Sequence, residues 1–84
     1  MPCVYDRNGM QLYLNFTPGH LLPHVHVYAR GLEAALAITT GDLLIGKLRS
    51  GDLRQAQRLI AANREKLLQG FTAAANHQRP ERID

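Results

Sequence analysis

Histidine residues supply the clearest chemistry that this sequence offers. His20, His24 and His26 fall within seven residues of one another, in the segment Gly19-His20-Leu21-Leu22-Pro23-His24-Val25-His26. A neutral imidazole is a good metal ligand, and its pKa near 6.5 also makes it a general acid or base close to neutral pH. This segment is therefore where a function is sought first.

Two of these histidines belong to a predicted strand and share one of its faces. His24 and His26 are two residues apart, so in an extended chain both side chains project to the same side, about 6.6 Å apart along the backbone. Their rings can converge on one ion, with His20 as a third ligand from the preceding loop, as in zinc-type sites that keep an open position. The expected cofactor is then a divalent metal such as zinc.

Two further roles of the histidines stay open. In the first, no cofactor is bound, and the imidazoles bond backbone carbonyls and stiffen the loop at Pro23. In the second, His24 and His26 are the catalytic acid and base of a hydrolase or ribonuclease, with Arg54 or Arg58 holding a phosphate. The sequence does not decide whether the protein is an enzyme.

A group of basic residues is the second candidate site. Lys47, Arg49, Arg54 and Arg58 lie just before and within one predicted helix, where Arg54 and Arg58 are one helical turn apart and suit a phosphate backbone. Tyr28 can add stacking on a base. The net charge of +3 is small for a dedicated nucleic-acid binder, and a solvated helix face accounts for the same four cations.

Alternation of apolar and polar residues predicts the strands that position these groups. Strands are expected at Cys3 to Asp6, Met10 to Phe16, His24 to Ala29, Leu32 to Ile38 and Leu43 to Leu48. Asn8-Gly9 and Arg30-Gly31 are expected to form tight turns between them, and Gly46 to mark a bulge or a close approach. The pattern therefore predicts an antiparallel meander of four or five strands.

From Ser50 onward, the apolar residues are spaced as in a helix. Apolar residues recur every three or four positions through Leu53, Ala56, Ile60, Leu67 and Phe71, which predicts one long C-terminal helix running to about Ala75. This apolar stripe is expected to cover one face of the sheet. The predicted fold class is α+β, a meander of four or five strands covered by one long C-terminal helix.

Length and composition set the remaining expectations. A chain of 84 residues suits a single domain over residues 1–84, in which residues 76–84 form a flexible tail. Cys3 is the one cysteine, and there is neither a secretory signal nor an apolar run of membrane-spanning length. These features favour a cytoplasmic protein that does not enter a membrane.

The chain resembles a known family at His20, Pro23, His24, His26, Thr40-Gly41 and Glu65-Lys66-Leu67-Leu68. This pattern is similar to that of the domain of unknown function 4160 family of small prokaryotic proteins. The resemblance implies a component of a two-gene module of toxin–antitoxin type. It also implies a partner from an adjacent gene of the domain of unknown function 2442 family, and no established activity.

The sequence departs from the family pattern in two places. Gly19 stands where an acidic residue commonly precedes the first histidine, so a possible metal ligand is missing. Arg30-Gly31 replaces a glycine-rich turn, which places a non-glycine residue in a tight turn.

Exposed strand edges favour a binding role. A small meander under one helix leaves unpaired edges, which a partner protein or a second copy can cover. Leu21, Leu22, Ala35 and Ala37 are the apolar residues expected at such a contact. The sequence thus predicts a small cytoplasmic interaction protein, with nucleic acid as a further possible partner and a histidine-dependent hydrolase or ribonuclease as the alternative.

Overall fold

The computed structural model of the chain describes residues 2–15 and 22–84. Within them the elements follow one another as β1 (Cys3–Arg7), β2 (Met10–Tyr13), β3 (His24–Ala29), β4 (Leu32–Ala37), β5 (Leu43–Gly46), α1 (Ser50–Ala62) and α2 (Arg64–Ala75). No helix in this part of the chain is long and apolar enough to cross a membrane.

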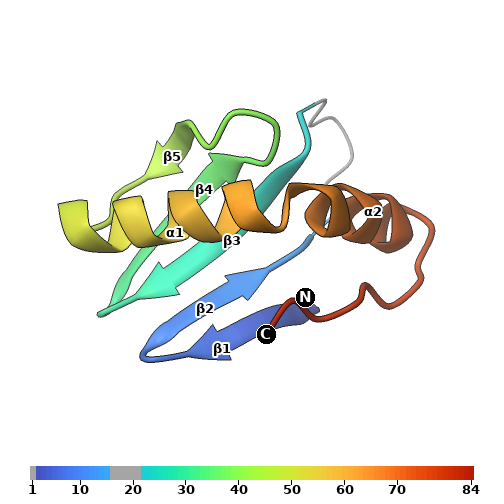
Figure 1. The fold of residues 1–84 in the computed structure, drawn as a ribbon, viewed down its shortest axis with the longest axis horizontal. Coiled ribbons are helices and arrows are strands. Elements are labelled where there is room, and N and C mark those ends of the chain that lie inside the picture. The colour runs from blue at the N-terminus through green and yellow to red at the C-terminus, as the bar shows by residue number, and fades with distance from the viewer. Residues whose placement is uncertain (1, 16–21) are drawn as a thin grey trace.

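The strands form a single five-stranded sheet in the order of the sequence, and every neighbouring pair is antiparallel (Figure 1). This confirms the predicted meander. Two-residue turns join β1 to β2 and β3 to β4. Both turn pairs have positive φ angles, 54° and 79° for Asn8-Gly9 and 53° and 77° for Arg30-Gly31, as the twist of a tight hairpin requires.

Side-chain alternation divides the sheet into a covered face and an opposite face. Leu12, Val27 and Ala34 lie side by side across the three central strands, and all three are buried. Both helices lie over this face (Figure 1), where Ala56, Ile60 and Leu67 join the same hydrophobic core. The fold class is therefore α+β, as predicted.

The prediction of one long C-terminal helix is wrong, because the helical region is divided at Asn63. This residue has φ −125° and ψ 23°, outside helical values, and ends α1 one residue before α2 begins. Its side-chain Nδ2 donates to the carbonyl oxygen of Leu59 at 3.0 Å. Asparagine bonds nearby backbone groups in this way and so competes with the helix ladder, a local signal that apolar periodicity does not contain.

Side chains of both helices hold the loop that follows β4. Arg64 Nε, at the start of α2, donates to the carbonyl oxygen of Ile38 at 2.8 Å. Gln57 Nε2, on α1, donates to the carbonyl oxygen of Gly41 at 3.0 Å. The loop is thus fixed to both helices through the backbone carbonyl groups of Ile38 and Gly41.

The last residues of the chain lie along the outer edge of β1, where the red end of the ribbon returns in Figure 1. The backbone N–H of Ile83 donates to the carbonyl oxygen of Val4 at 2.8 Å, and the N–H of Asp6 donates to Asp84 Oδ2 at 2.9 Å. Arg82 pairs with Asp84 at 2.8 Å. Residues 76–84, predicted as a flexible tail, therefore end in a segment that covers this edge.

The opposite edge strand, β5, follows an irregular register with β4. The pairing shifts between Ala35 and Leu36, and Gly46 has φ +87°. A Cβ atom on Gly46 would lie 2.3 Å from the carbonyl oxygen of Glu33, so only glycine fits this close approach. The predicted bulge or close approach at Gly46 is confirmed.

The contact between the tail and β1 is expected to depend on pH. The hydrogen bond from Arg82, followed by that from the Asp6 backbone, lowers the pKa of Asp84 from 3.8 to about 2. A lowered pKa means that the fold favours the carboxylate, so its stabilising effect is present above pH 3.8 and is lost as the pH falls through about 2.

Asp84→Asn should therefore lower the amide-exchange protection factors of Ile83 and Asp6 at pH 5. Acidification toward pH 2 should lower the same protection factors in the wild type, each taken relative to the intrinsic exchange rate at that pH. Exchange at Leu36, in the centre of the sheet, is the internal control. Unchanged exchange at Ile83 in the variant would show that the carboxylate does not hold the tail.

Candidate functional site

The two described histidines of the cluster lie together at the start of β3. The ring centroids of His24 and His26 are 5.1 Å apart, with the rings 76° to each other. His24 also lies 5.5 Å from the ring of Phe71 on α2 and is only 3% exposed. His24 is therefore a packed residue, whereas His26 is partly exposed.

A backbone contact orients the ring of His24. Its Nδ1 lies 3.0 Å from the carbonyl oxygen of Leu22. Since a carbonyl oxygen only accepts, Nδ1 carries a hydrogen and donates it to Leu22. This is the kind of carbonyl contact expected when the imidazole stiffens the loop at Pro23.

The predicted metal site is only partly covered by the structure. His20 lies outside the described residues, and within them no group of three or more histidine, cysteine or acidic side chains is placed to hold an ion. A zinc-type site at His24 and His26 therefore needs a third ligand such as His20. The metal site stays a prediction.

The four predicted basic residues are all exposed and follow one another from the end of β5 into α1. Arg58 Nη2 donates to Gln55 on the same helix at 2.8 Å. Tyr28 lies on β3, on the sheet face that points away from the helices. Its cross-strand neighbours are Gln11 on β2 and Glu33 on β4. The sheet therefore separates Tyr28 from Arg54 and Arg58, although their binding roles remain untested predictions.

Tyr28 belongs instead to a small polar group on the face opposite the helices. Its ring packs edge-to-face with Tyr13 at a centroid distance of 5.3 Å. A hydrogen bond with Glu33, followed by burial, raises the pKa of the Tyr28 hydroxyl. The tyrosine is thus engaged with a carboxylate, which repels phosphate.

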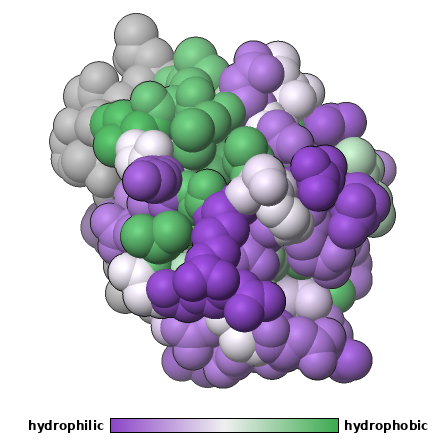
Figure 2. All heavy atoms as spheres, turned by 90° about the vertical axis from the view of Figure 1, so that its left-hand side faces the viewer, coloured by the Kyte–Doolittle hydropathy of each residue, from purple (hydrophilic) through white to green (hydrophobic). Residues whose placement is uncertain are grey.

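Large apolar side chains are exposed on β5. Leu43, Leu44 and Ile45 are 44%, 43% and 66% exposed, and we call these three residues the β5 surface. Figure 2, which looks at the molecule from the side that is at the left of Figure 1, shows hydrophobic atoms gathered in the upper part and strongly hydrophilic atoms below them. Grouped exposure of apolar side chains is a feature that interaction sites commonly have.

A small cavity of about 110 Å³ adjoins the β5 surface. His24 and His26 from β3, three residues of β4 and three of β5 line it; they are His24, His26, Glu33, Ala34, Ala35, Leu44, Ile45 and Gly46. The histidines and the exposed strand edge therefore contribute to one site. Neither the cavity nor its link to β5 follows from residue spacing.

The expected contact residues are only partly exposed. Leu22 is 48% exposed, but Ala35 and Ala37 are buried, and Leu21 lies outside the described residues. The expectation is therefore wrong for Ala37, which is fully buried, whereas Ala35 contributes only to the wall of the cavity beside β5. The sequence shows that Ala35 and Ala37 share one face of their strand and that this face is only weakly polar. Whether other elements cover it depends on the tertiary structure, which the alternation pattern does not contain.

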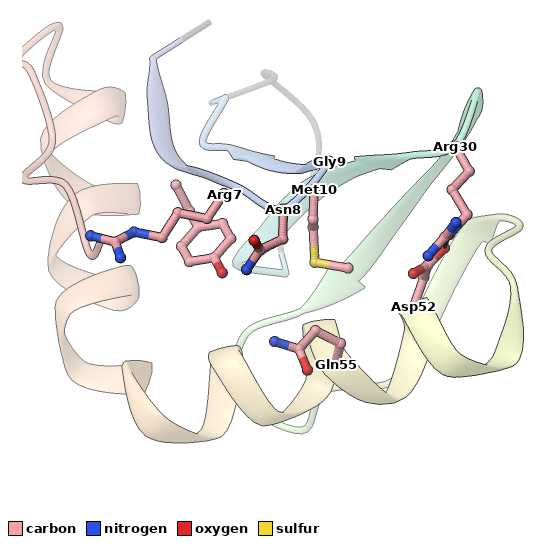
Figure 3. A pocket seen from close by; sticks show the side chains of 8 residues that line it. Arg7, Asn8, Gly9, Met10, Arg30, Asp52 and Gln55 are labelled. Carbon is pink, nitrogen blue, oxygen red and sulfur yellow. Dashed lines mark hydrogen bonds and ion pairs between the residues drawn. The ribbon is translucent and has the colours of Figure 1, made fainter.

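A wider hollow of about 440 Å³ lies between the two hairpin turns and α1. In Figure 3, Asn8, Met10 and Gln55 point into it, Arg7 points away, and Arg30 meets Asp52, with 3.0 Å between Nε and Oδ2. This ion pair neutralises the cation at the rim. The sequence predicts the tight turn at Arg30, but its pairing with Asp52 joins elements distant in sequence and does not follow from residue spacing.

Comparison with known proteins gives one family. A family model described as "Domain of unknown function (DUF4160)" matches residues 9–71. The match includes His24, His26, the β5 surface, the four predicted basic residues and most of the helical region. No curated protein and no solved structure matches the chain.

Loss of the His24 side chain should destabilise the fold. His24→Ala removes the Leu22 hydrogen bond and the contacts with His26 and Phe71, so we expect the free energy of unfolding to fall by about 1–3 kcal/mol. Urea denaturation followed by circular dichroism measures the change. His77→Asn, an exposed position with φ 57° that asparagine tolerates, is the control and should change stability by less than about 0.5 kcal/mol.

Equal stability of His24→Ala and wild type would contradict a structural role. That result would favour a role for His24 in binding or catalysis.

Proposed function

The chain belongs to the DUF4160 family, and we propose that it is a small cytoplasmic interaction protein, a component of a two-gene module of toxin–antitoxin type. It works by binding the protein encoded by the adjacent gene, a domain of unknown function 2442-like product. The partner docks on the β5 surface. The observation that carries this proposal is the exposure of Leu43, Leu44 and Ile45 on an edge strand.

Exposed edge strands are normally protected in natural proteins. A strand at the edge of a sheet offers unpaired N–H and C=O groups, and charged residues, proline or a covering segment usually prevent other chains from pairing with it. β1 has such a cover in residues 82–84. β5 instead exposes three consecutive apolar residues, which would favour pairing with another chain. This difference supports a docking role for β5.

The energy available from this surface is suited to binding. Burying a leucine or isoleucine side chain completely contributes about 1.5–3 kcal/mol, so each half-exposed side chain of β5 can add roughly 1 kcal/mol. Strand addition supplies backbone hydrogen bonds as well. Apolar burial and backbone hydrogen bonds together suit a partner that adds a strand to β5 and covers its apolar side chains.

A second candidate function is supported by the cavity beside β5. His24, His26 and Glu33 all line this space of about 110 Å³, which places two imidazoles and a carboxylate around one volume. Such a set can move protons in hydrolysis or RNA cleavage near neutral pH. This histidine-dependent hydrolase or ribonuclease is the alternative to the interaction protein.

Ile45→Lys should weaken binding of the adjacent gene product. The side chain is 66% exposed, so the fold tolerates lysine there, but a charge at the centre of the docking surface must be desolvated on binding. We expect affinity to fall at least tenfold in isothermal titration calorimetry.

Gln69→Lys is the matched control, because it adds the same charge at an exposed position of α2. Tight binding of the partner to both variants would exclude the β5 surface as the docking site. Failure of the wild type to bind at micromolar concentration would contradict the proposed function itself.

The alternative predicts that activity depends on His26. His26→Gln keeps a polar side chain of similar size, so the fold should survive while turnover of a fluorescent RNA or ester substrate falls by about 10²–10⁴-fold. Unchanged turnover in the folded variant would exclude the enzyme hypothesis. Metal analysis of protein purified without chelating resin separates its metal-dependent and metal-independent forms.

A further inference from the structure

We propose that the segment bound at β5 is an extended strand of an acidic protein. Its carboxylates lie toward Lys47 and Arg49, and one of its apolar side chains enters the cavity beside His26. This inference rests on the proposed function, because it names the chemistry of the occupant of the same β5 surface.

The geometry of the edge selects an extended segment. β5 pairs with β4 on one side only, and its other side has no backbone partner among the described residues. A strand added there continues the antiparallel sheet without rearrangement of the core. In that orientation the N-terminal end of the added strand lies beside Gly46 and Lys47, and its C-terminal end lies beside Leu43.

Charge distinguishes the two ends of this edge. Lys47 follows β5 directly and Arg49 follows two residues later, and both are exposed. The ion pairs of the described residues are Arg30–Asp52 and Arg82–Asp84, so neither Lys47 nor Arg49 has an ion-pair partner among those residues. Asp42 precedes β5 at the other end. Carboxylates near the N-terminal end of the added strand therefore meet two cations.

The cavity selects an apolar side chain. Its volume of about 110 Å³ is several times the roughly 30 Å³ that one water occupies in the liquid, so it can accept a single side chain. Ala34, Ala35, Leu44 and Ile45 supply most of its apolar wall. Because alternate residues of a strand point to the same side, one residue of the added strand can fill it while its neighbours face away.

An acidic protein strand fits better than nucleic acid. The cations adjoin apolar side chains and unpaired backbone groups, which a peptide can satisfy and a phosphate chain cannot. Tyr13 and Tyr28, the tyrosines of the face opposite the helices, pack against each other, and Glu33 accompanies Tyr28. The described structure therefore does not bring base-stacking rings together with Arg54 and Arg58.

A second copy of this chain would fit the β5 edge less well than an acidic segment would. Antiparallel pairing of two β5 strands would offer Asp42 of one copy to Lys47 and Arg49 of the other, one carboxylate for two cations. It would also bring together two chains of net charge +3. An acidic segment can satisfy both cations without this repulsion.

The test uses two labelled nine-residue peptides of alternating valine and threonine. One begins with two glutamates and the other with two lysines, so the pair differs only in charge at the end expected to lie near Lys47. Fluorescence anisotropy should show at least tenfold tighter binding of the acidic peptide to the wild-type protein. Binding should weaken as salt increases and should be lost in Ile45→Lys.

Charge reversal locates the contact. Lys47→Glu with Arg49→Glu should remove the preference for the acidic peptide or reverse it. Arg54→Glu with Arg58→Glu makes the same change in net charge on α1 and should leave the preference largely unchanged. An equal loss in both double variants would mean that only overall charge matters and would overturn the inference.

The other outcomes separate this inference from the proposed function. Equal binding of both peptides, or of neither, overturns the acidic-strand assignment, and binding of the adjacent gene product then still tests the function. A wild-type dimer in light scattering that Ile45→Lys converts to monomer assigns β5 to a second copy. Tight binding of a single-stranded oligonucleotide that Arg54→Glu with Arg58→Glu weakens assigns the basic residues to nucleic acid, and both results also overturn the inference.

Discussion

Backbone hydrogen bonding at the two edges of the sheet is the constraint on which this structure depends. A meander of five strands has two outermost strands, each with one row of N–H and C=O groups that face away from the sheet. At β1 the chain satisfies part of that row itself, through Ile83 and Asp84. At β5 the described residues do not, and that side carries apolar side chains in place of protection. The proposed function follows from this difference.

The helices determine which surfaces remain available. α1 and α2 cover the sheet face that holds Leu12 and Val27, and Arg64 and Gln57 fix the loop after β4 by its carbonyl groups. That loop leads directly into β5. The helices therefore stabilise the position of the exposed strand without covering it, and the basic residues that follow β5 remain in solvent.

Much of the fold could be predicted from sequence because it depends on local rules. Period-two alternation located the strands, and Asn8-Gly9 and Arg30-Gly31 located the tight turns. The division at Asn63 was missed because it depends on the backbone conformation and local hydrogen bonding of one residue, to which apolar spacing is insensitive. At the site, alternation placed His24 and His26 together, but the burial of His24 against Phe71 and the cavity shared with β5 depend on elements distant in sequence.

The covered edge at β1 also limits how large an assembly this protein can build. If both edges were open, β5 of one copy could pair with β1 of the next. Each added copy would then expose a new edge, and growth could continue into a fibre. With Ile83 bonded along part of β1, addition of a strand is hindered at that edge. The docking proposed at β5 would therefore give finite complexes, with one partner strand for each chain, and release of the C-terminal residues would remove that limit.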